Sequence, residues 1–221
     1  MDKTIFHALN GSESLVLDHI MLDITTWWVW LPLYVMLAIL VIKNSETIPR
    51  MLFTIGMALL CFAMTEIITD VIVKPWVARV RPCNDPTVHS VLVDGYAPEG
   101  FSFYSAHAAN ICGLVTYICL LVRSKSMSIF LCIWALLSCF SRIYLGVHYP
   151  LDVVVGMAVG IVVAILCYRL LKVFEMQAST SNHYVSRKLT RAGYAMSDCD
   201  EVICILLFLF VCIAIHSVVA N

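Results

Sequence analysis

The chain has 221 residues, of which 61% are hydrophobic and 13% charged, and its mean hydropathy is +0.90. A soluble globular domain is about 45–50% apolar and about 25% charged, so these values exclude an ordinary water-soluble domain and predict a membrane protein. The formal net charge of −1, without a basic tail, gives no reason to expect a nucleic-acid partner.

Residues 1–24 mix apolar and charged side chains, with a break at Asn10-Gly11. This pattern predicts an interfacial segment of amphipathic helices lying on the membrane surface. A structured loop is the alternative.

Residues 25–221 contain stretches long and apolar enough to cross a membrane as helices. The stretches lie at about 25–42, 51–73, 105–122, 127–145, 152–172 and 202–219. Since the bilayer offers no partner for free backbone groups, each stretch is expected to be helical. The chain is too short for a separate soluble domain, so the prediction is an all-α bundle of six transmembrane helices.

The lysines and arginines set the expected orientation, because they concentrate in inner loops. Nine of the fourteen fall in or next to the loops on one side of the predicted bundle. These nine are Lys43, Arg50, Arg123, Lys125, Arg169, Lys172, Arg187, Lys188 and Arg191. Both termini and the loop 74–104 are therefore expected on the outer side.

The ten cysteines do not predict a disulfide framework or a zinc site. All except Cys83 and Cys199 lie within apolar runs, where cysteine behaves as a small hydrophobic residue. These two are predicted to lie in polar loops.

Polar side chains gather at the predicted outer ends of spans two to five. Charges near a membrane are costly and mark functional sites by default. The residues concerned are Lys74, Arg81, Ser105, His107, Ser141, Arg142, His148 and Asp152. Because the spans alternate in direction, all four ends meet at one level of the bundle.

The first part of this set is suited to a phosphate group. Lys74 offers a point charge, and Arg81 and Arg142 offer planar forks that match phosphoryl oxygens. Ser105 stands where a helix N-cap belongs, and the free N–H groups of a helix start attract anions. An arginine near a helix end also commonly extends its charge to lipid headgroups, so each residue alone has a simpler explanation.

The second part is suited to nucleophilic catalysis. His148 and Asp152 are four residues apart, so the carboxylate can accept an imidazole N–H and leave the other ring nitrogen free to attack. His107 arrives on another helix and can serve as acid and then base. A lone membrane histidine is more often a packed, hydrogen-bonded group, and it is the joint occurrence at one face that favours catalysis.

The spacing of these residues resembles that of the type 2 phosphatidic acid phosphatase family, which shares its site with the vanadium haloperoxidases. Lys74 and Arg81-Pro82 match the family's first motif, and Ser141-Arg142, His148 and Asp152 match its third. The middle motif, Pro-Ser-Gly-His in the family, reads Tyr104-Ser105-Ala106-His107 here. Ser105 and His107 carry over, and Ala106 replaces the glycine beside the phosphate.

The resemblance implies a role for each matched residue. His148 attacks phosphorus, oriented by Asp152, and His107 protonates the leaving oxygen and later activates water. The phosphate-binding residues implied are Lys74, Arg81, Ser105 and Arg142. No metal or other cofactor is expected, because the cationic side chains supply the positive charge. Asp70, four residues before Lys74, is expected to steady it as part of a ladder with Glu66, with substrate contact as the alternative.

The expected function is that of an integral membrane lipid phosphatase. Its small size resembles bacterial members, which favours undecaprenyl diphosphate as substrate. A lipid A phosphatase and a phosphatidylglycerophosphate or phosphatidic acid phosphatase are alternatives, and an anion-binding transporter is the alternative of another class. The expected location is the bacterial inner membrane, as a multi-pass protein whose active site faces the periplasm. The oligomeric state stays open.

Overall fold

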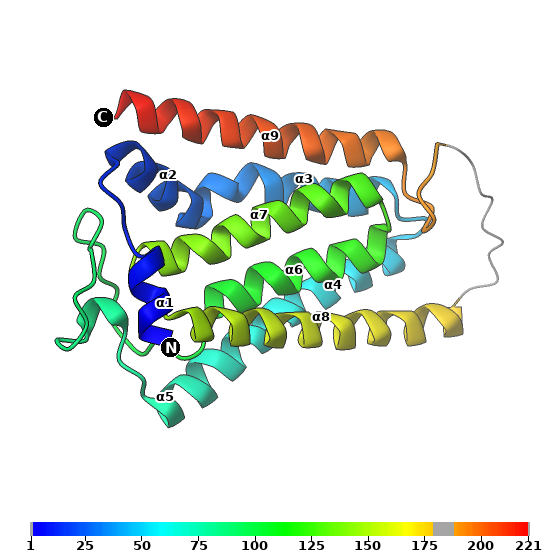
Figure 1. The fold of residues 1–221 in the computed structure, drawn as a ribbon. Helices are drawn as coiled ribbons and strands as arrows, with labels where there is room; N and C mark the ends of the chain where they lie inside the picture. The colour runs from blue at the N-terminus through cyan, green and yellow to red at the C-terminus, as the bar shows by residue number, and fades with distance from the viewer. Residues whose placement is uncertain (1, 179–187, 221) are drawn as a thin grey trace.

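The computed structural model describes residues 2–178 and 188–220, and its regular elements in that part of the chain are all helical (Figure 1). Backbone pairing of the β type is limited there to the isolated bridges Val80–Phe101 and Leu189–Ala195. The predicted all-α class is therefore confirmed.

Two helices form the N-terminal segment, α1 (Asp2–Leu9) and α2 (Leu15–Thr25). They are separated at Asn10-Gly11, where Gly11 has a φ of +67° that favours glycine. The side chain of Ser14 caps α2 by accepting from Leu17 N. The helices and the break agree with the sequence, whereas their placement on a membrane surface stays a prediction.

The first span is shorter and more bent than the sequence predicts. A turn of 3₁₀-helix, η1 (Trp27–Trp30), precedes α3 (Leu31–Lys43), and the axis turns by 67° between Leu15–Thr25 and Trp27–Lys43. The buried Trp30 indole donates to Ile24 O across the bend at 2.9 Å, which fixes it. The straight helix thus begins at Leu31 rather than near residue 25.

The remaining spans agree with the predicted stretches. They are α4 (Ile48–Glu66), continued by the π-helical η2 (Ile67–Val73) and α5 (Lys74–Val77), then α6 (Ala106–Val122), α7 (Lys125–Tyr144), α8 (Pro150–Ala178) and α9 (Met196–Val219). Within the described residues, four helices are long and apolar enough to cross a membrane, the bent pair makes a fifth, and the 17-residue α6 is a shorter apolar helix. The chain is a multi-pass membrane protein, and the six predicted helices fit.

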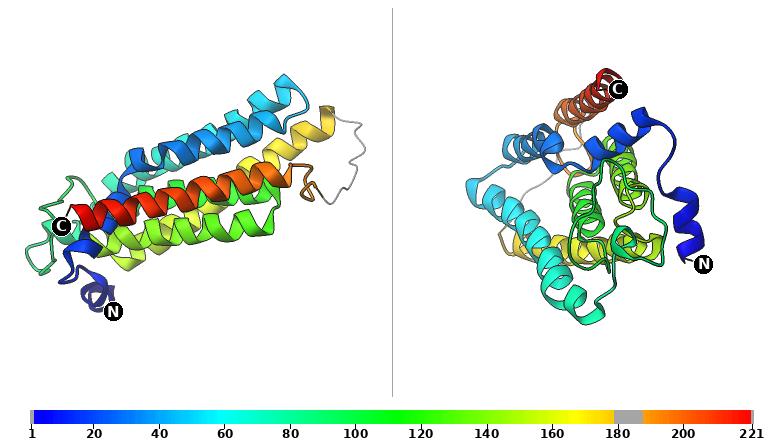
Figure 2. Two further views of the ribbon diagram at one scale, coloured as in Figure 1. Left: turned by 90° about the horizontal axis from the view of Figure 1, so that it is seen from above. Right: turned by 90° about the vertical axis from the view of Figure 1, so that its left-hand side faces the viewer.

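The bundle is built around a close contact between α6 and α8, which lie along each other (Figures 1 and 2). A Cβ added to Gly160 would overlap Ala109 O, and one added to Gly156 would stand 2.5 Å from Ser105 O. Glycines four residues apart let two membrane helices approach this closely. The first turns of α6 and α8 are therefore held side by side, and both carry predicted site residues.

The opposite end of the bundle is tied by ion pairs. Arg50 pairs with Glu175 at 3.0 Å, and Lys43 pairs with Asp198 at 2.5 Å. Cys199 was predicted to lie in a polar loop, and this was wrong. It is buried in the first turn of α9, because that helix begins at Met196. Arg187, one of the nine cations assigned to the inner side, lies outside the described residues.

Candidate active site

The predicted site residues lie at one end of the bundle, the left-hand end in Figure 1. Ser105, Ala106 and His107 stand at the start of α6, and Arg142 stands in the last turn of α7. His148 lies in the turn before α8, and Asp152 in its first turn. These helix ends share one level, as the alternating direction of the spans requires.

His148 and Arg81 are in direct contact. Arg81 follows α5 in an extended segment, and its Nη1 lies 3.3 Å from His148 Nε2 and 3.3 Å from Val147 O. Both side chains are almost entirely buried. The position of His148 is fixed from the backbone as well, because its N–H donates to Arg142 O at 3.2 Å.

Asp152 does not make the hydrogen bond expected from the sequence. Its Oδ2 is 3.8 Å from His148 Nδ1, which is longer than a hydrogen bond, and accepts instead from Tyr149 N at 3.0 Å. Its Oδ1 accepts from Arg79 Nη1 at 2.5 Å. The carboxylate therefore faces the imidazole while its hydrogen bonds go to neighbouring groups.

Arg142 is buried with part of its fork engaged. Its Nη1 donates to Thr25 Oγ1 and, at 3.5 Å, to the hydroxyl of Tyr96. Tyr96 belongs to the loop 84–100, which therefore reaches this arginine. Thr25 belongs to α2, so the N-terminal segment also reaches this arginine.

The start of α6 has the local geometry expected of an anion-binding helix end. The fully buried Ser105 is its N-cap and accepts from Ala108 N at 3.3 Å, and Ser105 N donates to Asp152 O at 3.0 Å. Ala106 is the first residue of α6, and a helical backbone suits alanine well. The replacement of the family's glycine is thus compatible with the conformation of this turn.

Lys74 stands apart from the cluster. Its ammonium pairs with Asp70 at 2.5 Å, which is the predicted rung of the ladder, and both residues lie on the η2–α5 extension of α4. Glu66 does not continue the ladder but accepts from Asn110 on α6. Among the described residues, no hydrogen bond or ion pair joins Lys74 to His148, Arg81 or Arg142.

Several polar atoms of the cluster are buried without a partner in the described part of the chain. They are the Nε atoms of Arg81 and Arg142, the Nε2 atom of His107 and the Nδ1 atom of His148. Buried polar groups normally have partners. N–H donors of two guanidinium groups around one imidazole suit the oxygens of a tetrahedral anion.

The charge state of His148, in the turn between α7 and α8, follows from this environment. Burial lowers its pKa to about 4, with the charges of Arg142 and Arg81 acting in the same direction and Asp152 opposing them. Burial, and then the charge of Arg142, also lowers the pKa of Arg81. At neutral pH His148 is therefore an uncharged imidazole beside cations, the form in which it can act as a nucleophile.

Residues 50–175 match the PAP2 superfamily. The chain belongs to this superfamily. It is 32% identical over 163 residues to a lipid A 4'-phosphatase of Bacteroides thetaiotaomicron, with 72% of each chain covered. It is 31% identical to the undecaprenyl-diphosphatase BcrC of Bacillus subtilis, covering 76% of this chain and 83% of the relative.

A solved PAP2 structure has the same fold. It is a transmembrane PAP2-type phosphatidylglycerolphosphate phosphatase from Bacillus subtilis, with a TM-score of 0.58 and 27% identity over 82% of this chain and 87% of that one. The family resemblance and the class of membrane lipid phosphatase predicted from the motifs are thus confirmed. The relatives act on different lipid phosphates.

Three contacts at this PAP2 site were not predicted from the sequence. Arg79 binds Asp152, Tyr149 N binds the same carboxylate, and Thr25 binds Arg142. Arg79 lies inside the first motif, between Lys74 and Arg81, and its position there was the available signal. Thr25, the partner from the N-terminal segment, belongs to none of the three motifs.

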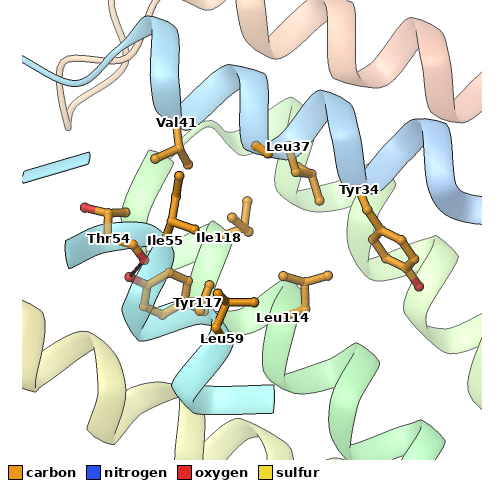
Figure 3. A pocket seen from close by; sticks show the side chains of 11 residues that line it. Tyr34, Leu37, Val41, Thr54, Ile55, Leu59, Leu114, Tyr117 and Ile118 are labelled. Atoms are coloured by element: carbon orange, nitrogen blue, oxygen red, sulfur yellow. Dashed lines mark hydrogen bonds between the residues drawn. The ribbon is translucent and has the colours of Figure 1, made fainter. Parts of the chain in front are cut away.

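An apolar cavity of about 170 Å³ lies elsewhere in the PAP2 bundle, between α3, α4 and α6 (Figure 3). Leu37, Leu59 and Leu114 line it, and the Tyr117 hydroxyl is occupied by a 2.9 Å bond to Thr54 O. It lies about 10–16 Å further along α6 than His107, at a rise of 1.5 Å per residue. The cavity therefore lies within the apolar part of the bundle, away from the cationic cluster.

Proposed function

We propose that this lipid phosphatase works through a phosphohistidine intermediate on His148. We further propose that its substrate is a phosphorylated lipid of the cell envelope, with undecaprenyl diphosphate as the first candidate. The observation that carries the mechanism is the buried His148 between Arg81, at 3.3 Å from Nε2, and Asp152, at 3.8 Å from Nδ1.

In the first step Nε2 of His148 attacks phosphorus. The N–P bond forms as the bond to the lipid oxygen breaks, and His107 gives its proton to that oxygen. The imidazole becomes cationic, and Asp152 stabilises the new charge. Arg81 and Arg142, with the first turn of α6 capped by Ser105, hold the phosphoryl oxygens. Lys74 completes this set once its ammonium leaves Asp70.

In the second step water attacks the phosphohistidine. His107, now unprotonated, accepts a proton from the water as the new P–O bond forms and the N–P bond breaks. Inorganic phosphate leaves and His148 returns to its neutral state. Every charge change is matched by a side chain in the cluster, so the scheme needs no metal.

The proposed substrate order rests on the relatives and on the size of the chain. Undecaprenyl diphosphate comes first because the match to BcrC, at 31% identity, spans 76% of this chain and 83% of BcrC. Lipid A is the second candidate, because the Bacteroides lipid A 4'-phosphatase is 32% identical over 72% of each chain. We further propose a bacterial inner membrane location with the site facing the periplasm.

The test of the mechanism is the variant His148→Ala in purified, detergent-solubilised protein. We expect phosphate release by the variant to fall to the background measured with a preparation from cells that lack the protein. We also expect ³²P-labelled substrate to leave an acid-labile label on the wild-type protein and none on the variant. Release near the wild-type rate by His148→Ala would overturn the proposal.

The substrate is tested with a panel of undecaprenyl diphosphate, lipid A, phosphatidylglycerophosphate and phosphatidic acid. We expect the highest kcat/KM for undecaprenyl diphosphate, inhibition by vanadate and full activity in EDTA. A preference for lipid A would support the second candidate. Binding of these lipids without phosphate release would instead favour an anion-binding protein or transporter.

A further inference from the structure

Asp152 is the end of a chain of three alternating charges. Its Oδ1 accepts from Arg79 Nη1 at 2.5 Å, and Arg79 Nη2 donates to Asp2 Oδ2 at 2.6 Å. Asp152 is fully buried, while Arg79 and Asp2 are each about three-quarters buried. The chain links α1 at the start of the sequence to the carboxylate that faces His148.

Arg79 is clamped so that it can hold Asp152 in one orientation. Its guanidinium lies 3.9 Å from the ring centroid of Tyr149, the residue after His148. The backbone N–H of Tyr149 takes the other oxygen of Asp152 at 3.0 Å. Both carboxylate oxygens are thereby fixed, with Oδ2 turned towards His148 Nδ1.

Asp2 is held in place by a backbone hydrogen bond and by the packing of α1. Its Oδ1 accepts from Leu151 N at 3.0 Å, one of the free N–H groups at the start of α8. Phe6 on the same helix is fully buried, with its ring centroid 5.6 Å from that of Tyr149. The packing of α1 therefore brings a carboxylate to the far side of Arg79.

We propose that Arg79 and Asp2 are positioning residues for the phosphoryl transfer, which hold Asp152 in place and preserve its negative charge for His148. The inference rests on the proposed function, in which Asp152 stabilises the cationic phosphohistidine. It gives α1 a part in the chemistry that its distance from the motifs does not suggest.

The charge balance explains why two residues are needed. The positive charge of Arg79 repels a cation on His148 and so cancels much of the attraction that Asp152 exerts on it. In a poorly screened site both interactions fall only as 1/r, so Arg79 acts on His148 although it lies beyond Asp152. Asp2 offsets Arg79 and leaves one net negative charge on the chain of three. Arg79 thus fixes the orientation of Asp152, and Asp2 compensates the positive charge of Arg79.

The test compares Arg79→Gln, Arg79→Lys and Asp2→Asn in the full-length purified protein, with the panel lipid that wild type hydrolyses fastest. We expect Arg79→Gln to lower kcat about 100-fold and Asp2→Asn about 10-fold, in the range of outer-shell substitutions, with KM changed less than about threefold. Arg79→Lys should recover part of kcat. The double variant should be no slower than Arg79→Gln, because Asp2 acts through Arg79.

Two control variants separate positioning from general loosening. Arg50 is as exposed as Arg79 and also pairs with two carboxylates, Glu46 and Glu175, but at the other end of the bundle. Lys3 ties α1 to the loop 84–100 through Thr87 at 3.1 Å and Asp85 at 3.5 Å, and among the described residues it has no hydrogen bond or ion pair with Arg79. Arg50→Gln and Lys3→Met should keep kcat within about twofold of wild type.

The outcomes distinguish this inference from the proposed function. If His148→Ala is inactive while Arg79→Gln and Asp2→Asn keep the wild-type kcat, the positioning role is wrong and the mechanism stands. The positioning role is also wrong if Lys3→Met loses as much activity as Asp2→Asn. If His148→Ala is active, the proposed function fails first. Should Arg79→Gln not fold, the near-isosteric Asp2→Asn decides alone.

Discussion

At the scale of single residues, the proposed mechanism depends on an uncharged His148. The imidazole is buried next to Arg81 and under the influence of Arg142, so a proton on it is strongly disfavoured. The same cations that suit a phosphate thereby keep the proposed nucleophile ready at neutral pH.

The pKa of His148 gives a prediction about acid pH. Because burial lowers this pKa to about 4, the unprotonated form persists as the pH falls and is lost only near that value. After correction for the substrate phosphate, whose second pKa is about 6, the acid limb that His148 sets on kcat/KM should be centred near pH 4. Below that pH, kcat/KM should fall about tenfold per pH unit. An acid limb centred at 6.5 would contradict the environment described.

Arg142 gives a second prediction, because its Nη1 is engaged with Thr25 and Tyr96 while its Nε has no partner among the described residues. Arg142→Lys keeps the charge but loses the fork, and each charge-assisted hydrogen bond is worth about 1.5–3 kcal/mol. We expect kcat/KM to fall about 10–100-fold with an unchanged thermal midpoint. Near-normal kinetics would show that Arg142 serves packing alone.

The sequence located the residues that carry motifs and missed those that do not. Arg81, Ser105, Arg142, His148 and Asp152 could be placed because fixed spacing on successive helices brings them to one level. The hydrogen bond from Arg79 to Asp2 joins residues 77 positions apart, and no sequence pattern around either residue indicates this pair. Such pairs arise from the path of the folded chain.

At the scale of elements, helix content followed from apolar length, whereas bends did not. The 67° turn after α2 occurs at Thr25-Thr26, without glycine or proline at the break, and is held by the Trp30 contact across it. The π-helical η2 likewise occurs within the stretch 51–73, which the sequence predicts as one continuous helix. Both features depend on packing between helices, which a single sequence does not reveal.

The contact of α6 with α8 gives a prediction at this scale. In Gly160→Ala the added Cβ would overlap the backbone oxygen of Ala109, so the helices must separate. We expect a loss of about 1–3 kcal/mol in stability and a fall in kcat, since Ser105 and His107 lie at the start of α6. Thermal midpoint and phosphate release would be measured together.

Gly56→Ala on α4 is the matched control for that substitution. A Cβ at Gly56 meets nothing within 4 Å, so the same chemical change there should leave stability unchanged or raise it slightly. Equal losses in the two variants would mean that the close approach of α6 and α8 is not what fixes the site.

At the scale of the whole molecule, the two ends of the bundle differ in kind. One end carries the cationic cluster under the loop 84–100, and the other carries the ion pairs of Lys43 and Arg50. Most of the chain's lysines and arginines belong to the second end. Since inner loops are enriched in these residues, the cluster is expected on the outer side.

This orientation is tested with two exposed glutamates, Glu99 in the loop 84–100 and Glu46 between α3 and α4. In a Cys83→Ser background, Glu99→Cys should react with an impermeant maleimide in sealed cells. Glu46→Cys should react only after permeabilisation, which also controls for the reactivity of both sites. Labelling of Glu46→Cys alone in sealed cells would invert the topology. The lipids available to the enzyme would then be those of the inner leaflet, which would remove the reason for expecting a periplasmic substrate.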